Sequence, residues 1–353
     1  MLTIQARRYS RLILLSLPVH LLVSSCSDPI QPPEQDAGSA VASAPIAAEV
    51  GRTRIAIDGA RFRINAALTY PGQPAEGKLM NVRMVNAVFE DLGRPQFNSA
   101  SNTDEFVSRM REYVSLGARA FTVSLQGGYP GYEGAVNSAF LANGDLKSGY
   151  LARVARVIEK ADALGAVILL SLYYQRQDQY LRDERAVRSG VVNVVDWIRR
   201  KGYRNVVLEI ANEYGHRGFN HAILRSDDGV ASLIRLAKDK LPSLYVSASY
   251  VANGRATPKV VAASDLILTH FNVLSISDIP ARVRALKTTY PNKPIVCNED
   301  DRTGSQAAAA ARASVGAGAS YGLMLNRNQH YPFYFQGRQD DPAAYGEYIA
   351  LTR

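Results

Sequence analysis

Two glutamates, Glu213 and Glu299, stand where a pair of carboxylates could act on one substrate. Each follows a short apolar run, at residues 205–211 and 294–298, and roughly three βα units of about 30 residues separate them. If both runs are strands of one parallel sheet, both side chains lie at the same edge. Two carboxyl groups in one cleft can hydrolyse a glycosidic bond, one as acid/base and the other as nucleophile. The dipeptide Asn212-Glu213 alone is weak support, because chance supplies on the order of one in a chain this long.

Apolar runs alternate with stretches of helical periodicity along most of the chain, which indicates parallel strands buried on both faces. An opening strand at residues 53–57 and the turn Asp58-Gly59 form a hairpin signal. Eight further runs over about 260 residues match the size of a TIM barrel. The predicted fold is α/β, a single (β/α)8 TIM barrel at residues 51–353 with a short N-terminal β-hairpin. The eight predicted strands are residues 60–64, 118–125, 166–172, 205–211, 244–249, 265–269, 294–298 and 320–325, and helices are predicted at 184–201, 230–240, 280–289 and 306–315.

A doubly wound open sheet is the alternative architecture. It is disfavoured because no glycine-rich nucleotide fingerprint follows the first strand, and Gly127, Gly128 and Gly131 after the second have the wrong spacing. We therefore expect no cofactor. A metal site is a minor alternative, since His216 and His221 are not spaced to share a helical face and no HExxH pattern is present. We expect no metal, a substrate contact for His216 and a packing role for His221.

The first 50 residues have the composition of an export signal and a tether. Arg7, Arg8 and Arg11 precede an apolar run at residues 12–23, which is too short to span a bilayer. The run ends before Cys26, in a stretch that resembles a bacterial lipobox, so we expect a signal peptide at residues 1–25 and a membrane anchor at Cys26. Residues 26–50 read as a flexible linker. The predicted location is exported and membrane-anchored, at the bacterial outer membrane, periplasm or cell surface; plain signal-peptidase cleavage is the alternative.

Charge and cysteine usage limit the other partners. The formal net charge is +9, but the sequence has no Lys/Arg cluster interleaved with aromatic residues, so we expect no nucleic-acid partner. We also expect a monomer. A mildly basic surface is compatible with anionic polysaccharide or lipid headgroups. If Cys26 is lipidated, Cys297 is the one remaining cysteine and forms no intramolecular disulfide; it is expected to be a small buried residue.

Several stretches resemble the clan A glycoside hydrolases, and most nearly the family 5 cellulase-like enzymes. They are the strand at residues 208–213, the strand end at 293–299, the pair Thr269-His270 and the hairpin at 55–65. The resemblance implies a retaining glycosidase acting on a β-linked oligo- or polysaccharide. Carried over residue by residue, it implies that Glu213 is the acid/base, Glu299 the nucleophile and Asn212 a donor to the substrate 2-hydroxyl, with Glu209 behind them and His270 lining the cleft.

The sequence also departs from the family pattern. The second strand ends at Gln126 without the usual Arg, and the sixth reads His270-Phe271-Asn272 where a Tyr is common. The one tryptophan of the chain, Trp197, lies on a predicted helix, so the usual Trp after strand eight is missing. These positions place Gln126 and Asn272 at the predicted mouth, but they leave the sugar and the linkage open.

Polar and aromatic groups near other strand ends could complete a substrate cleft. Tyr173 and Arg176 follow the third strand, and Arg176 could replace the missing Arg or be an ordinary surface residue. Asn326 follows the eighth strand, and the aromatic residues 331–335 could stack on sugar rings or simply pack together.

Catalysis would require Glu213 to be protonated and Glu299 ionised. Asn298, Arg302 or a nearby hydroxyl could support the charge on Glu299. Two alternatives stay open: both glutamates could be solvated strand ends, or the chain could be a non-catalytic carbohydrate-binding lipoprotein on a glycosidase-like barrel.

Overall fold

In this computed structural model the described residues are 51–128, 136–251, 253–331 and 333–353. The predicted signal peptide, the linker and Cys26 lie outside them. Within the described residues, no helix is long and apolar enough to cross a membrane.

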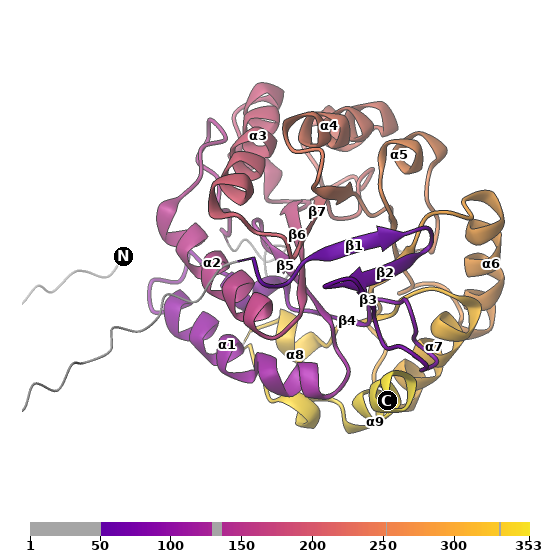
Figure 1. Ribbon diagram of the computed structural model, residues 1–353. Helices are drawn as coiled ribbons and strands as arrows, with labels where there is room; N and C mark the ends of the chain where they lie inside the picture. The colour runs from indigo at the N-terminus through magenta and orange to yellow at the C-terminus, as the bar shows by residue number, and fades with distance from the viewer. Residues whose placement is uncertain (1–50, 129–135, 252, 332) are drawn as a thin grey trace, which may run out of the picture. The chain divides into compact units, whose positions relative to one another are not determined.

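Eight parallel strands form the centre of the fold. Figure 1 labels four of them, β4 to β7, inside the circle of helices. Six pair in the order β11-β4-β5-β6-β7-β8, and β9 pairs with β10. Isolated parallel bridges join the two groups: Ser249 pairs with Leu268 after β8, and Val296 of β10 pairs with Ser320 before β11. These bridges complete a ring of eight strands, the predicted TIM barrel. The strands are β4 (Asn81–Arg83), β5 (Ala120–Ser124), β6 (Val167–Tyr173), β7 (Val206–Ala211), β8 (Tyr245–Ser247), β9 (Ile267–His270), β10 (Ile295–Glu299) and β11 (Gly322–Leu323).

Helices surround this ring and connect its strands (Figure 1). They are α1 (Ser99–Ser115), α2 (Ser148–Ala163), α3 (Glu184–Lys201), α4 (Asp227–Lys240), α5 (Pro258–Ala263), α6 (Ile279–Thr289), α7 (Gly304–Ala317), α8 (Asn326–Gln329) and α9 (Pro342–Thr352). Short 3-10 helices are η1 (Val85–Val88), η3 (Asp178–Tyr180), η4 (Ala222–Leu224), η5 (Ile276–Asp278) and η6 (Gly337–Asp340).

Helix α3 shows how local sequence sets these boundaries. Asp183 caps its first turn by accepting a hydrogen bond from the Ala186 N–H, and Gly202 ends the helix at a φ of 70°. That positive φ costs a glycine little, because glycine has no Cβ to collide with the backbone. The predicted range of residues 184–201 is confirmed.

The prediction of residues 60–64 as the first barrel strand is wrong. They form β2 (Arg61–Ile64), the middle strand of an antiparallel sheet with β1 (Ile55–Asp58) and β3 (Ala67–Leu68). In β2 the buried Phe62 lies between an exposed and a half-buried arginine, whereas all three residues of β4 are buried. A strand with one solvated face cannot occupy the doubly covered barrel wall.

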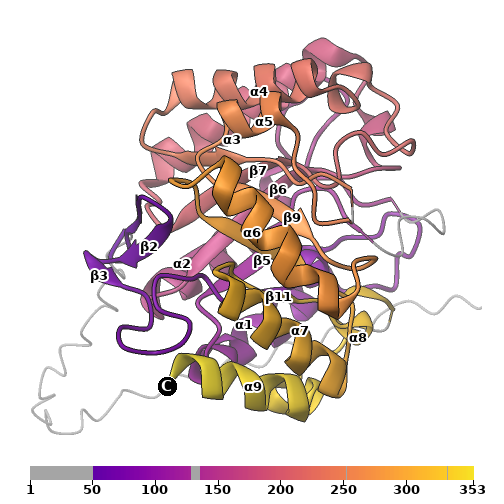
Figure 2. The same ribbon diagram turned by 90° about the vertical axis from the view of Figure 1, so that its right-hand side faces the viewer.

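The hairpin sheet instead seals one end of the barrel. Phe62 and Ile55 share an apolar cluster with side chains of β5, β6, β7, β9 and β10. Figure 2 shows β2 and β3 at one end of the barrel and α8, which follows β11, at the other. The carboxyl ends of the strands lie at the end that carries α8, and the predicted site residues lie there too.

Candidate active site

The two predicted glutamates meet at the mouth of the barrel. Glu299 is the last residue of β10, and Glu213 follows Asn212 just after β7. A carboxylate oxygen of Glu213, one of Glu299 and a ring nitrogen of His270 all lie within 4.8 Å of one another. Glu213 is held at a φ of 49°, and its backbone N–H donates to the Ser249 Oγ at 3.0 Å. A left-handed backbone is unusual for a residue with a side chain and is often found at functional sites.

Buried donors and cations surround the Glu299 carboxylate. Arg83 at the end of β4 places its Nε 2.9 Å from Glu299 Oε2, and Asn272 donates its Nδ2 hydrogen to Glu299 Oε1 at 2.9 Å. Burial alone would raise the pKa of Glu299, but Arg83, His270 and the Asn272 hydrogen bond together lower it below its ordinary value. The site therefore keeps Glu299 ionised, as a nucleophile requires.

His270 lies between the two carboxylates. Its Nδ1 is 3.1 Å from Glu213 Oε1 and 3.6 Å from Glu299 Oε2, and its side chain is fully buried. Burial alone would lower the pKa of His270, but the charges of Glu299 and Glu213 outweigh it and raise the pKa. A protonated His270 would donate to Glu213 and offset part of the negative charge in the pair.

Asn212 is fixed by hydrogen bonds at both ends of its amide. Its Oδ1 accepts from Arg83 Nη2 at 2.7 Å, and its Nδ2 donates to Gln175 Oε1 at 3.3 Å. Gln175 also reaches Glu213, donating from Nε2 to Oε2 at 3.4 Å. The side chains of Arg83, Asn212, Gln175 and the two glutamates thus form one connected network.

Arg83 was not among the residues predicted from the sequence, because the hairpin was counted as the first strand and β4 is only three residues long. The stretch Leu79 to Arg83, an apolar pair followed by a polar strand end, was the available signal. The predicted support of Glu299 by Arg302 or Asn298 is wrong. Arg302 pairs with Asp300 at 2.7 Å, and the Asn298 amide donates to Glu209 Oε1 at 3.4 Å.

Two predicted substrate contacts point into the protein instead. The Tyr173 hydroxyl donates to the Val187 carbonyl at 2.5 Å, and its ring packs on Phe140, so it belongs to the interface with α3. The buried Gln126 amide donates to Ser138 and accepts from the Tyr174 N–H, which orders the loops after β5 and β6. Strict alternation would have placed Tyr173 on the same face as Val167 and Leu169, inside the barrel, but it lies with Leu172 in the apolar cluster between the strands and the helices.

The other predicted contacts lie at the rim. The Arg176 N–H donates to the Gly218 carbonyl, and Gly218 in turn donates to His216 Nδ1, both at 2.9 Å. Arg176 and Asn326, the first residue of α8, are exposed, and His216 is half-buried. Their contact with substrate stays a prediction. His221 lies 2.9 Å from Asp178, in the packing role expected for it.

The aromatic segment after β11 is mostly a packing cluster. Phe333 packs edge-on against Phe89 and stacks with Tyr331, and Phe335 is fully buried. Tyr334 is exposed. Residues 129–135 after β5 lie outside the described residues.

Glu213, His270 and Glu299 also present the donor set of a small metal site. The Arg83 guanidinium stands 2.9 Å from Glu299 Oε2 and already supplies a positive charge beside this set. A divalent cation next to this guanidinium would be repelled. The donor set therefore fits an ion poorly, and the absence of a metal stays a prediction.

No protein-family model and no curated protein matches the sequence. Solved structures do match. A broad-specificity endoglucanase from Clostridium longisporum aligns with a TM-score of 0.56 at 11% identity, over 77% of this chain and 95% of the endoglucanase. An endo-1,4-β-mannanase from Eisenia fetida gives 0.58 at 13% identity, over 85% and 95% of the two chains. A family 5 glycoside hydrolase from Bacteroides vulgatus gives 0.57 at 13% identity, over 84% and 68%. The chain therefore shares the TIM-barrel fold of these glycoside hydrolases, the fold that the motifs predicted.

Proposed function

We propose that this chain is a retaining glycoside hydrolase that cleaves a β-linked oligo- or polysaccharide. The observation that carries the proposal is the carboxylate pair: oxygens of Glu213 and Glu299 lie within 4.8 Å at the mouth of the barrel. Retaining enzymes place their two carboxyl groups about 5 to 5.5 Å apart, whereas inverting enzymes need about 6.5 Å or more for a water molecule. The spacing supports retention.

Each carboxyl has a separate role in the proposed reaction. Glu299, kept ionised by Arg83, attacks the anomeric carbon and forms a glycosyl ester while the bond to the leaving oxygen breaks. Glu213 gives its proton to that oxygen. In the second step Glu213 takes a proton from water, the hydroxyl adds to the anomeric carbon, and the Glu299 carboxylate leaves. The Nδ2 of Asn212 is proposed to donate to the substrate 2-hydroxyl, because Arg83 fixes the other end of its amide.

The structural neighbours suggest the first substrates to test. Their titles describe endoglucanases and mannanases, and one is a complex with cellotriose. We propose β-1,4-glucans and β-1,4-mannans as the initial panel, with aryl β-glycosides as activated substrates.

The sharpest test replaces the proposed nucleophile. Glu299→Gly should lower hydrolysis of an aryl β-glycoside at least about 10⁴-fold, and added azide should restore turnover by forming a glycosyl azide of inverted configuration. Glu209→Gln is the matched control, because this buried carboxylate lies behind the site and contacts Asn298. Hydrolysis that survives in Glu299→Gly would rule out the assignment.

The non-catalytic alternative predicts binding of a β-glycan without release of reducing ends, even at high protein concentration. The missing strand-two Arg was one reason for it. In this chain Arg83 stands beside Glu299 and supplies a cation next to the carboxylate, so the missing strand-two Arg no longer favours the non-catalytic alternative.

We further propose that the protein is a monomer tethered by lipid at Cys26. Cys26→Ser should move it from the membrane fraction to the soluble fraction. An unchanged distribution, or the lack of a mass increase at Cys26 in the wild-type chain, would rule out the anchor.

A further inference from the structure

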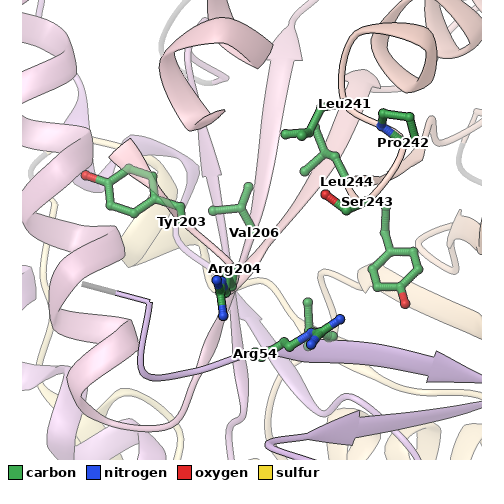
Figure 3. Close-up of a pocket in the computed structure, with 10 residues that line it drawn as sticks. Arg54, Tyr203, Arg204, Val206, Leu241, Pro242, Ser243 and Leu244 are labelled. Carbon is green, nitrogen blue, oxygen red and sulfur yellow. The ribbon is translucent and has the colours of Figure 1, made fainter. Parts of the chain in front are cut away.

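A pocket of about 380 Å³ opens at the end of the barrel opposite the two glutamates. Figure 3 shows the side chains that line it. Three segments line it: the start of β1, the connection from α3 to β7, and the connection from α4 to β8. Its polar side chains are Arg54, Arg204, Tyr203, Ser243 and Tyr245. The pocket lies at the amino ends of β7 and β8, so it shares no residue with the proposed catalytic network.

Two arginines give the pocket its charge. Arg54 and Arg204 are exposed, and the hydrogen bond from the Ile55 N–H to the Arg204 carbonyl holds their backbones together. Within the described residues, neither guanidinium belongs to an ion pair. The nearby carboxylates have other partners: Asp162 accepts from the N–H groups of residues 51–53, and Glu159 pairs with Lys201.

Helix electrostatics account for other cations at this end but not for these two. Lys201 and Lys240 lie in the last turns of α3 and α4, where a positive charge offsets the helix dipole. Arg204 lies beyond the end of α3, and Arg54 comes from the segment before β1. Tyr245 adds a hydroxyl that accepts from the Ile57 N–H at 3.1 Å and retains a proton to donate.

We propose that this pocket binds a phosphate group, with Arg54 and Arg204 as its two cationic ligands. Guanidinium groups bind phosphate oxygens through paired N–H donors, and the pocket is large enough for a headgroup phosphate with its glycerol. Gly51, where the described structure begins, faces the Arg204 side chain.

The test uses the full chain with Cys26→Ser, so that no lipid anchor contributes. Binding is measured by co-sedimentation with phosphatidylglycerol vesicles at low salt and, separately, by calorimetric titration with inorganic phosphate. Arg54→Gln with Arg204→Gln should weaken binding roughly 10- to 30-fold. Arg185→Gln with Arg188→Gln is the matched control, because it removes the same charge from two exposed arginines near the start of α3.

The outcomes separate the possible sources of phosphate. Arginine-dependent binding to vesicles supports a lipid headgroup, and arginine-dependent binding of inorganic phosphate alone supports a soluble phosphorylated ligand. No binding of either probe, or equal weakening by the two double variants, overturns the proposal. Unchanged melting temperatures would exclude misfolding as the cause. Glycosidase activity should stay the same in all variants, because the pocket lies at the other end of the barrel.

Discussion

Arg83 at the mouth of the barrel is fully buried, with its Nε 2.9 Å from Glu299, whereas Arg54 and Arg204 at the opposite end are exposed. Burial removes water from a charge, so Arg83 must be compensated by neighbouring carboxylates and amides. The exposed arginines carry no such requirement. Charges at the mouth therefore depend on one another, and a single substitution there should disturb several groups at once.

The barrel end sealed by the hairpin has a different source of stability. Phe62, Ile55 and the strand residues beneath them form an apolar cluster without a buried ion pair. Substitutions there should change the free energy of unfolding and leave the chemistry intact. The two ends thus separate the proposed catalysis from stability, as expected of a TIM barrel.

Among variants that keep both glutamates, the largest effect is expected for Arg83→Gln. Without the guanidinium the pKa of Glu299 should rise, because burial opposes ionisation of the carboxyl and the positive charge of Arg83, which favours ionisation, is gone. The acid limb of the pH profile of kcat/KM should move to higher pH, and kcat should fall about 10²- to 10³-fold. The profile is measured with an aryl β-glycoside.

Arg302→Gln is the control for Arg83→Gln. It removes another ion pair at the mouth, that of Arg302 with Asp300, without touching Glu299. It should lower stability but leave the acid limb in place. An equal shift of the limb in both variants would show that Arg83 acts through general destabilisation.

The sequence was sufficient to predict the barrel, the boundaries of α3 and the meeting of Glu213 with Glu299, because these follow from apolar periodicity and from strand ends. It was insufficient for Arg83, since a three-residue strand carries too little periodicity to be recognised. The orientation of Tyr173 was also out of reach. Which face of a strand end looks into the cleft depends on barrel geometry rather than on local residue types.

An intermediate effect is expected for Phe62→Ala at the sealed end. Truncating this fully buried ring should lower the free energy of unfolding by about 3 to 5 kcal/mol, measured by urea denaturation. The kcat/KM of the folded fraction should stay within about twofold. Arg61→Ala, on the exposed side of the same strand, should change stability by less than about 0.5 kcal/mol. A large loss of kcat/KM in Phe62→Ala would mean that the two ends are coupled.

The smallest effect is expected for Tyr173→Phe, which tests whether this residue belongs to the mouth or to the core. The change removes one hydroxyl that donates to the Val187 carbonyl, so unfolding should become easier by about 1 kcal/mol. KM and kcat should not change. Gln175→Ala, two residues beyond the end of β6, is the matched comparison, because its amide contacts both Glu213 and Asn212, and its kcat should fall about tenfold. A rise in KM for Tyr173→Phe would show that Tyr173 contacts the substrate. The interface between β6 and α3 would then be part of the substrate cleft.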